Sequence, residues 1–430
     1  MITAKAFAGK HYAIYGLARS GLATAEALLA SGARATGWDS KEEARARAPA
    51  GTEIANLDEA DLGQFDSLVV TPGLPLNRHP IAQRAREAGV EIVGDIELFA
   101  CARPELPPHK VVGITGTNGK STTTALIHHI LKTAGVPTTM GGNIGLPILA
   151  QDPLPDGGVY VLELSSYQID LTQSLDCDVA VLLNITPDHL DRYDDFEAYA
   201  ASKVRLFEMQ SAGKASIFNG EDGVVQNLLS RGEKWKFASR PISLATSAVL
   251  PGVTLSGSLQ GPHNLANTLC ALEACVQLGV IGSSVRDGIE TFPGLPHRME
   301  RVREKDGVIF VNDSKATNPT ATAPALAAFP SIRWILGGQA KTDDLDECAP
   351  HFAHVRSAYT IGEAGELFAK LLGPHMPVAN CETLENALNQ AAKDSQAGDT
   401  VLLSPACASF DQFRDFEQRG DRFRDLVGAL

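Results

Sequence analysis

The sequence predicts an α/β protein built from three domains with parallel sheets. Its 430 residues exceed what a single hydrophobic core usually organises. Short apolar runs alternate with helical stretches along the chain, which is typical of β/α units. Breaks rich in proline and glycine interrupt the alternation, as in the linker-like segment 103–109 and at 293–301. We expect domains of residues 1–95, 96–296 and 297–430.

The first 95 residues predict a Rossmann-like domain. Helical stretches near 20–31, 41–48 and 78–88 separate short apolar runs, so the strands should be parallel. The runs are 11–15, 35–38, 67–70 and 90–93.

A glycine-rich turn follows the first run. Residues 16–21, GLARSG, resemble G-x-G-x-x-G, but Ala18 replaces the glycine that lets the backbone approach a pyrophosphate most closely. Asp39 lies roughly 20 residues further on, where an acid commonly binds a ribose hydroxyl. The pattern favours a nucleotide other than NAD. Plain turn and helix-packing roles for Gly16 and Gly21 are the alternative.

The most specific motif is VVGITGTNGKST, residues 111–122. An apolar strand runs there into a glycine-rich turn and then into a helix, an arrangement that binds phosphate. Lys120 would reach the outer phosphates and Ser121 would offer its hydroxyl to Mg²⁺. The strict pattern G-x-x-x-x-G-K-[ST] fails, because Ile114 stands where it requires glycine. The backbone N–H groups expected to face the anion are those of Gly116, Thr117, Asn118 and Gly119.

Two acidic or basic side chains downstream share the expected sheet edge with this loop. Glu163 ends the apolar strand 159–164, where a carboxylate is costly unless it meets a cation or hydrogen-bond donors. A metal would satisfy it, and a surface-facing glutamate is the alternative. His189 lies in the loop NITPDHLDR after the strand 178–183, at the strand end where parallel sheets bind ligands, so we favour a functional role.

Lys203 stands in the apolar stripe of a helix. Phe196, Tyr199 and Phe207 share its spacing, and such stripes normally exclude lysine. One interpretation is snorkelling, with a buried stem and an ammonium in water. The other is that desolvation lowers the lysine pKa, leaving a neutral amine that can capture CO₂ as a carbamate and so become a metal ligand.

The last third of the chain predicts another Rossmann-like domain. Its apolar runs lie at 308–312, 332–336, 357–361 and 400–403. Loops with acid, lysine, amide and hydroxyl groups follow three of them and should converge on one edge; these loops are 312–318, 337–341 and 404–411. Cys407 is expected to be a packed residue rather than a nucleophile. Further upstream, His263 or Asn264 is either a helix N-cap or a nucleotide contact.

Composition restricts the function classes. A net charge of −14 argues against a nucleic-acid or anionic-membrane surface, so bound phosphate must be held locally. The seven cysteines form no C-x-x-C pair, and neither a signal peptide nor a long apolar span is apparent. We therefore expect a cytoplasmic protein, without membrane insertion, and a monomer.

Motifs spread from residue 115 to residue 420 resemble the Mur ligase family of ATP-dependent amide-forming enzymes. They are TGTNGKST, ELSSYQ, DHLDR, HN, HR, NDSKATN and SPACASFDQFRDFEQRG. The resemblance implies a peptidoglycan precursor ligase that activates the carboxyl of UDP-N-acetylmuramoyl-L-alanine with ATP. The amine of D-glutamate would then attack the acyl phosphate, releasing ADP and phosphate. Phe410 departs from the family pattern, which has leucine there.

The resemblance also implies cofactors and site residues. ATP and two Mg²⁺ ions are expected, with Mn²⁺ able to substitute and Lys203 carbamylated. The catalytic residues would be Lys120, His189, Lys203 and Lys315. ATP would contact Gly116, Thr117, Asn118, Gly119, Lys120, Ser121, Thr122, Asn264, Arg298 and Asp313. The metal ligands would be Ser121, Glu163, His189 and Lys203. The UDP substrate would contact Gly16, Leu17, Ala18, Asp39, Ser40, Gly73 and Asn143, and D-glutamate would contact Thr317, Lys341, Ser409 and Phe416.

Three rival functions are weighed against this one. A folylpolyglutamate-type ligase would share the phosphate loop, but the complete N-terminal β/α domain with Asp39 speaks against it. A regulatory nucleotide-binding protein would not need Glu163, His189 and Lys203 together. A dehydrogenase built on Gly16 to Gly21 is disfavoured by Ala18 and leaves residues 116–121 unexplained.

Overall fold

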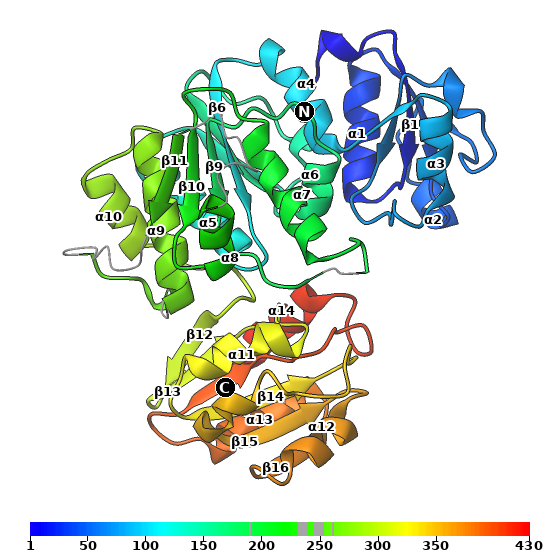
Figure 1. Ribbon diagram of the computed structural model, residues 1–430. Coiled ribbons are helices and arrows are strands. Elements are labelled where there is room, and N and C mark those ends of the chain that lie inside the picture. The colour runs from blue at the N-terminus through cyan, green and yellow to red at the C-terminus, as the bar shows by residue number, and fades with distance from the viewer. Residues whose placement is uncertain (189–190, 231–239, 245–252, 260–261) are drawn as a thin grey trace. The chain divides into compact units, whose positions relative to one another are not determined.

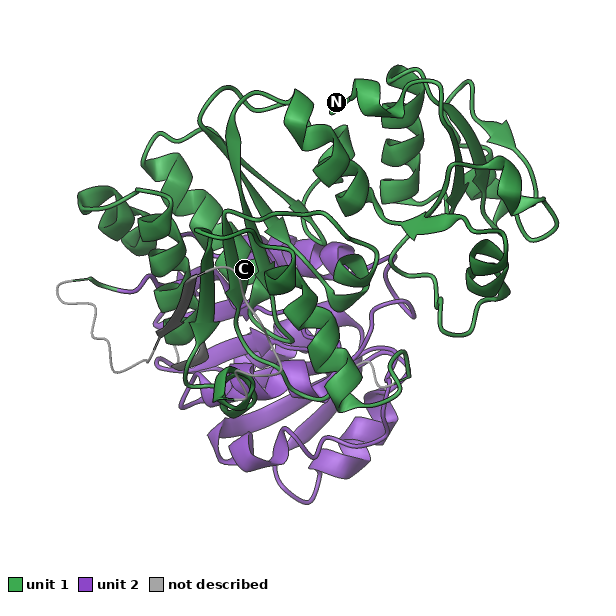
Figure 2. Cartoon of the chain, turned by 45° about the horizontal axis from the view of Figure 1, so that its top comes forward, with its two compact units in different colours: residues 1–254, 262–291 green, residues 255–261, 292–430 purple. Residues whose placement is uncertain are grey.

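A computed structural model of the chain describes residues 1–188, 191–230, 240–244, 253–259 and 262–430. Within these residues the chain forms sheets of five, six and six strands, one for each expected domain (Figure 1). The chain divides into two compact units, residues 1–254 with 262–291, and residues 255–261 with 292–430 (Figure 2).

The first sheet has the strand order β3-β2-β1-β4-β5, and all its strand pairs are parallel. This confirms the predicted Rossmann-like arrangement. The strand β3 was not predicted, because two exposed residues carry no periodic pattern. Its elements are β1 (His11–Tyr15), α1 (Arg19–Ala30), β2 (Arg34–Trp38), α2 (Glu42–Arg45), β3 (Glu53–Ile54), β4 (Ser67–Val70), α3 (Pro80–Glu87), β5 (Glu91–Val93) and α4 (Asp95–Ala102).

Both faces of this sheet are covered, and for that reason β1 reads as an unbroken buried run. Tyr12 and Ile14 belong to the core cluster that contains Leu28 of α1, whereas Ala13 belongs to the cluster that contains Ile81 of α3. Alternate residues of a strand point to opposite faces, so the two helices flank the sheet. The loops at its carboxyl edge are left available for a ligand.

The second sheet is also entirely parallel, in the order β11-β10-β9-β6-β8-β7. It places β6, which leads into the phosphate loop, between β8 and β9. The loops predicted to share an edge therefore follow adjacent strands. The elements are β6 (His109–Thr115), α5 (Lys120–Thr133), β7 (Thr138–Gly142), β8 (Gly158–Glu163), α6 (Ser166–Asp170), β9 (Val179–Leu182), α7 (Phe196–Glu208), β10 (Ala215–Asn219), α8 (Gly223–Ser230), β11 (Arg240–Leu244), α9 (Pro262–Gln277) and α10 (Ser283–Glu290).

The first two sheets share one continuous core. Phe99 of α4 packs edge-on against Tyr160 of β8, with ring centroids 5.1 Å apart. The segment 103–109, expected as a linker, begins with a 3₁₀ turn over Arg103–Glu105 and ends where β6 begins at His109. The guanidinium of Arg103 donates to the carbonyl of Asp176 at 2.6 Å, which fixes this segment to the central sheet.

The third sheet has the order β12-β13-β17-β14-β15-β16. The strand β12 is an antiparallel edge strand paired with β13, and the other pairs are parallel. We predicted a series beginning at Val308 and missed β12, because its charged sequence ERVREK lacks an apolar run. The elements are β12 (Glu300–Lys305), β13 (Val308–Asn312), α11 (Pro319–Ala327), β14 (Ile332–Gly337), β15 (Val355–Ile361), α12 (Gly365–Leu372), β16 (Val378–Glu382), α13 (Leu384–Asp394), β17 (Thr400–Leu403) and α14 (Phe416–Ala429).

Candidate active site

The phosphate loop joins β6 to α5 and depends on two glycines. Gly116 and Gly119 have φ angles of +149° and +85°, which L side chains rarely adopt. A Cβ on Gly119 would lie 2.4 Å from Oδ1 of Asn267, and one on Gly116 would lie 3.1 Å from Cβ of Leu183. The helix that follows has 14 residues and begins at Lys120, so its N-terminus faces the loop.

Asn184, in the loop after β9, accepts two hydrogen bonds from the backbone of the phosphate loop. Its carbonyl accepts from the N–H of Thr117 at 3.0 Å, and its Oδ1 accepts from the N–H of Asn118 at 2.8 Å. The expectation that both of these N–H groups face the anion is therefore wrong in this structure. Sequence reasoning noted Asn184 only as a loop residue, because an asparagine after a strand has many roles.

Lys120 is folded over the loop that it follows. Its Nζ donates to the carbonyl oxygens of Gly116 at 2.9 Å and Thr117 at 2.7 Å. These contacts place the ammonium above the loop, within reach of a group bound there. Ser121 and Thr122 follow in the first turn of α5.

Lys203 of α7 contacts the same loop. It is only 2% exposed, and its Nζ donates to the carbonyl of Gly116 at 3.0 Å. Burial, and then the positive charge of Lys120, lower the pKa of Lys203 to about 7. The snorkelling interpretation is wrong, because the nitrogen is inside the protein. Its amine is neutral in a substantial fraction of molecules near neutral pH, as carbamate formation requires.

Tyr199 completes the surroundings of Lys203 and was missed as a functional residue. The Lys203 nitrogen lies 4.6 Å from the centre of its ring, and its hydroxyl is 3.1 Å from Oγ1 of Thr117. The helical spacing of Tyr199 and Lys203 was visible in the sequence, but it indicated only a shared face.

Glu163, at the end of β8, is 2% exposed, so the surface-facing alternative is wrong. Its Oε1 accepts from Nδ2 of Asn143 at 2.9 Å, and Asn143 also donates its N–H to the Glu163 carbonyl at 2.8 Å. The second carboxylate oxygen, Oε2, is buried without a hydrogen-bond partner. A buried carboxylate oxygen in this state fits a cation, which would supply the missing interaction.

The remaining predicted metal ligand, His189, lies outside the described residues. Among the residues that are described, no cluster of three or more His, Cys, Asp or Glu is placed to hold a metal ion. The proposed ligand set does not depend on such a cluster, because it contains a serine and a modified lysine.

The first domain brings two of its predicted contacts together. Asp39 accepts from the N–H of Leu17 at 2.8 Å and from the N–H of Lys41 at 3.0 Å, so both of its oxygens brace the loops around them. Gly16 has a φ of +101°, and a Cβ there would lie 2.5 Å from Oγ1 of Thr71. Ala18 is the N-cap residue of α1. Ser40 also lies here, and its carbonyl accepts from Arg45.

Gly73 differs from Gly16. It lies in the turn after β4, where the N–H of Leu74 donates to the carbonyl of Thr71 at 3.0 Å. Its φ lies outside the left-handed region, and a Cβ would meet nothing within 4 Å. Neither backbone conformation nor packing therefore requires glycine, which leaves close approach by a ligand as a reason for it.

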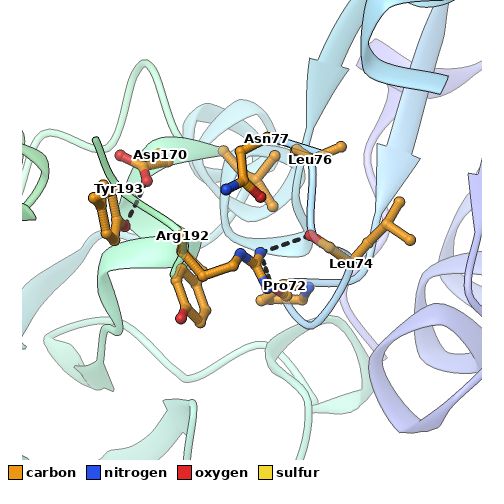
Figure 3. Close-up of a pocket in the computed structure, with 9 residues that line it drawn as sticks. Pro72, Leu74, Leu76, Asn77, Asp170, Arg192 and Tyr193 are labelled. Atoms are coloured by element: carbon orange, nitrogen blue, oxygen red, sulfur yellow. Dashed lines mark hydrogen bonds between the residues drawn. The ribbon is translucent and has the colours of Figure 1, made fainter. Parts of the chain in front are cut away.

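A pocket of about 200 Å³ lies beside this turn, lined by the segment after β4, by α6 and by the loop before α7 (Figure 3). Arg192, Tyr193 and Asp170 line the pocket, and the Tyr193 hydroxyl donates to the Asp170 carboxylate at 2.7 Å. Leu74, Leu76, Asn77 and Tyr167 are among the residues that line it.

In unit 2, the three predicted loops converge at one edge of the third sheet. The N–H of Gly337 donates to the carbonyl of Pro405 at 2.9 Å, and Oγ of Ser404 donates to Asp313 at 2.8 Å. Asp313 is buried, and burial raises its pKa to about 7. Arg298 lies in the segment before β12.

Three of the predicted D-glutamate residues, Thr317, Lys341 and Ser409, lie on these loops, and the fourth, Phe416, begins α14. The Lys315 ammonium is 3.9 Å from the centre of the Phe416 ring, and Nζ of Lys341 is 3.4 Å from Oγ1 of Thr317. Ser409 is buried, as is Cys407, which confirms the packed role expected for that thiol. Phe410 is 68% exposed.

Arg419 of α14 was not predicted, although it is 1% exposed. Its guanidinium donates to Ser314, Cys407 and Ala408, and it thereby joins two of the converging loops. A further contact with the carbonyl of Gly337, at 3.5 Å, reaches the third. All these acceptors are uncharged oxygens, so no acidic partner in the sequence pointed to it.

Asn264 lies within the first turn of α9, and its Oδ1 accepts from Nδ2 of Asn267 at 3.2 Å. The alternative in which Asn264 is an N-cap is wrong, since its backbone is already helical. No helix in the described part of the chain is long and apolar enough to cross a bilayer.

Family comparisons identify the class of protein. The Mur ligase MurD-like N-terminal domain matches residues 10–94, the Mur ligase middle domain matches 114–275, and the Mur ligase glutamate ligase domain matches 297–407. The chain belongs to the Mur ligase family, in agreement with its three α/β sheets and its phosphate loop.

Individual relatives narrow the similarity within the family. The UDP-N-acetylmuramoylalanine–D-glutamate ligase of Novosphingobium aromaticivorans is 60% identical, over 100% of this chain and 97% of the relative. The enzyme of the same name from Sphingopyxis alaskensis is 56% identical over 100% of both chains.

Solved structures support the fold. The UDP-N-acetylmuramate-alanine ligase of Thermotoga maritima has a TM-score of 0.60 at 17% identity, covering 98% of this chain and 99% of its own. Escherichia coli FolC has a TM-score of 0.57 at 20% identity, covering 78% and 93%. At these identities the similarity concerns the fold alone.

Proposed function

We propose that this protein is an ATP-dependent ligase of peptidoglycan precursor synthesis. It adds D-glutamate to UDP-N-acetylmuramoyl-L-alanine through an acyl phosphate, with release of ADP and phosphate. The observation that carries the chemistry is the convergence of Lys120 and Lys203 on the carbonyl of Gly116. The full-length similarity to curated D-glutamate ligases supports the choice of substrates.

The three parts of the chain would divide the work. Residues 1–95 would bind the UDP substrate, 96–296 would bind ATP, and 297–430 would bind the amino acid. In the first part the contacts are Gly16, Leu17, Ala18, Asp39, Ser40 and Gly73, with Asn143 from the second. Since the Leu17 N–H already donates to Asp39, the side chain or carbonyl of Leu17 would make its contact.

Phosphoryl transfer from ATP to the substrate carboxylate needs its negative charge to be stabilised. Lys120 would leave the carbonyl oxygens of Gly116 and Thr117 and turn to the transferred phosphoryl group. Lys315 would act near the reacting phosphates. The other ATP contacts would be Gly116, Thr117, Asn118, Gly119, Ser121, Thr122, Asn264, Arg298 and Asp313. Because the N–H groups of Thr117 and Asn118 donate to Asn184, these two residues would contact ATP through their other groups.

The predicted ligands would hold two divalent cations, a proposal supported by the unpartnered buried oxygen of Glu163. Ser121 and Glu163 would hold one, and His189 with carbamylated Lys203 would hold the other. When bound, Mg²⁺ or Mn²⁺ would spread the charge of the transferring phosphoryl group. The carbamate forms when the neutral amine of Lys203 bonds to the carbon of CO₂ and loses a proton, which converts a base into an anionic oxygen ligand.

D-glutamate would be held by Thr317, Lys341, Ser409 and Phe416. Its amine would attack the acyl phosphate, and collapse of the tetrahedral intermediate would expel phosphate. The converging loops of unit 2 support this assignment, because they gather lysines and hydroxyl groups on one edge, where Lys315 also contacts the Phe416 ring of α14.

Phosphate release tests the proposal. With ATP, Mg²⁺ and UDP-N-acetylmuramoyl-L-alanine, release and amide formation should appear with D-glutamate and be absent with L-glutamate, L-lysine or no amino acid. Release that is independent of the acceptor would support a regulatory ATPase instead. Activity with a folate substrate would support the folylpolyglutamate-type reading.

A further inference from the structure

Arg192 links two segments of unit 1 that are far apart in sequence. Its guanidinium donates to the carbonyl oxygens of Leu74 at 2.7 Å and Pro72 at 3.5 Å (Figure 3). It also donates to the carbonyl oxygen of Gly73 at 3.3 Å. Arg192 belongs to the loop between β9 and α7, whereas the three carbonyls belong to the turn after β4. The guanidinium also lies 4.2 Å from the centre of the Tyr167 ring, which holds its plane toward the turn.

The link is reciprocal. Nδ2 of Asn77 and Nη2 of Arg78 donate to the carbonyl of Asp191, at 3.0 and 2.8 Å. Side chains on each segment therefore bind backbone oxygens on the other. Every acceptor is an uncharged carbonyl, so the contact depends on the positions of the backbones more than on net charge.

The turn held by Arg192 is the one that carries Gly73. Gly73 has no local reason to be glycine, as shown above. Thr71, at the start of the same turn, packs closely against Gly16. A Cβ added to Gly16 would lie 2.5 Å from Oγ1 of Thr71. A shift of this turn would therefore displace two of the proposed contacts with the UDP substrate.

We propose that Arg192 is a positioning residue for the UDP-linked substrate. It sets the place of the 71–74 turn against the carboxyl edge of the central sheet, and it acts through that turn without touching the substrate. The inference rests on the proposed function. It adds that recognition of the substrate by the first domain depends on a side chain of the second.

The geometry needs arginine in particular. A guanidinium offers five N–H donors in a rigid plane, and Arg192 spreads them over consecutive carbonyls while stacking on Tyr167. A lysine would keep the charge but lose the plane and most of the donors. Arg192 lines the adjacent pocket of about 200 Å³, so its side chain is not tightly packed on every side. Substitution at this position need not disrupt packing.

The test compares Arg192→Met and Arg192→Lys with Arg205→Met. Arg205 is a matched control, because it also donates to a backbone carbonyl, that of Thr172 at 3.0 Å, but within the second domain. Steady-state kinetics would be measured with each of the three substrates varied in turn. Hydrogen–deuterium exchange of the substrate-free protein would follow the amides of residues 71–79.

We expect Arg192→Met to raise KM for UDP-N-acetylmuramoyl-L-alanine by about tenfold or more, since charge-assisted hydrogen bonds of this kind are removed. KM for ATP and for D-glutamate should stay within about twofold of the wild type, and amides 71–79 should exchange faster. Arg192→Lys should recover only a small part of the loss. Arg205→Met should leave all three KM values unchanged.

Three outcomes would overturn the inference. Unchanged KM for the UDP substrate in Arg192→Met would do so, as would equal rises in all three KM values, which indicate a general structural role. Full recovery by Arg192→Lys would show that charge alone matters. If the wild type itself forms no amide, the proposed function fails, while the exchange measurement still shows whether Arg192 holds the turn.

Discussion

Asn143 donates a hydrogen bond to one carboxylate oxygen of Glu163 at 2.9 Å, and the other oxygen is buried without a partner. Glu97, in the same unit, is buried as well, but both of its oxygens accept hydrogen bonds from Gln173 and Ser174. The two buried glutamates therefore differ in how far their hydrogen-bonding capacity is satisfied. Only Glu163 retains an unused acceptor.

Glu163→Gln should weaken binding of Mn²⁺ and abolish most ligase activity while leaving thermal stability unchanged or raised, because it removes an unpaired buried charge. Glu97→Gln should lower the free energy of unfolding by roughly 1.5–3 kcal/mol, through lost charge-assisted hydrogen bonds, and keep metal affinity. Electron paramagnetic resonance of Mn²⁺ and differential scanning fluorimetry give the two readouts. Equal destabilisation by both changes would show that Glu163 is structural.

Lys203 should form a carbamate. Incubation with ¹³C-bicarbonate should give a ¹³C carbamate signal in the wild-type protein, because its amine is partly neutral near pH 7. Lys203→Met should lose the signal and reduce kcat on the order of 10²-fold or more, as expected when a group that supports transition-state charge is removed. A wild-type enzyme that stays fully active after exhaustive removal of CO₂, without a carbamate signal, would contradict this.

The glycines at 16 and 73 should respond differently to alanine. Gly16→Ala should destabilise the protein by several kcal/mol, because its φ is +101° and its Cβ would clash with Thr71. Gly73→Ala should leave the melting temperature unchanged and raise KM for the UDP substrate, because only an approaching ligand would meet the new methyl group. If Gly73→Ala binds the substrate normally, Gly73 is not a contact.

Arg419 should be essential to the amino-acid edge of unit 2. Arg419→Lys cannot satisfy the oxygens of Ser314, Cys407 and Ala408 together, so buried acceptors would be left unpaired at a cost of roughly 2–4 kcal/mol. We expect a lower melting temperature and a higher KM for D-glutamate, with KM for the UDP substrate unchanged. Arg422→Lys is the control, since Arg422 lies on the same helix and pairs with Glu385 at the surface. Equal effects of the two changes would contradict the assignment.

The sequence predicted the features that repeat or that have a fixed offset. Apolar runs followed by helices identified the central strands, and the order strand, glycine turn and Lys-Ser located the phosphate loop. The charged edge strand β12 was missed, because half-exposed edge strands need no apolar run.

Contacts that use backbone oxygens were also missed. Arg192 and Arg419 bind backbone carbonyl groups, which every residue possesses. No complementary side chain in the sequence therefore indicates these contacts. The stripe that contains Lys203 indicated burial, but it could not identify the acceptor of Lys203, the Gly116 carbonyl, which lies 87 residues away in the chain. Such partners require the assembled sheet.

Asp95 should make stability depend on pH below neutrality. It begins α4 and is fully buried, and burial raises its pKa to about 6, against an ordinary value of 3.8. Between about pH 4 and 6 the folded state therefore holds more protons than the unfolded state, so the stability contributed by this group falls as pH rises through that window.

Asp95→Asn removes the titration but can still accept from the N–H of Ile96, as Asp95 does at 3.1 Å. Relative to this variant, the wild type should lose roughly 2–3 kcal/mol between pH 4 and pH 7, seen as a widening gap in melting temperature. Parallel melting curves across this range would place the Asp95 carboxyl in a more polar environment than the structure gives it.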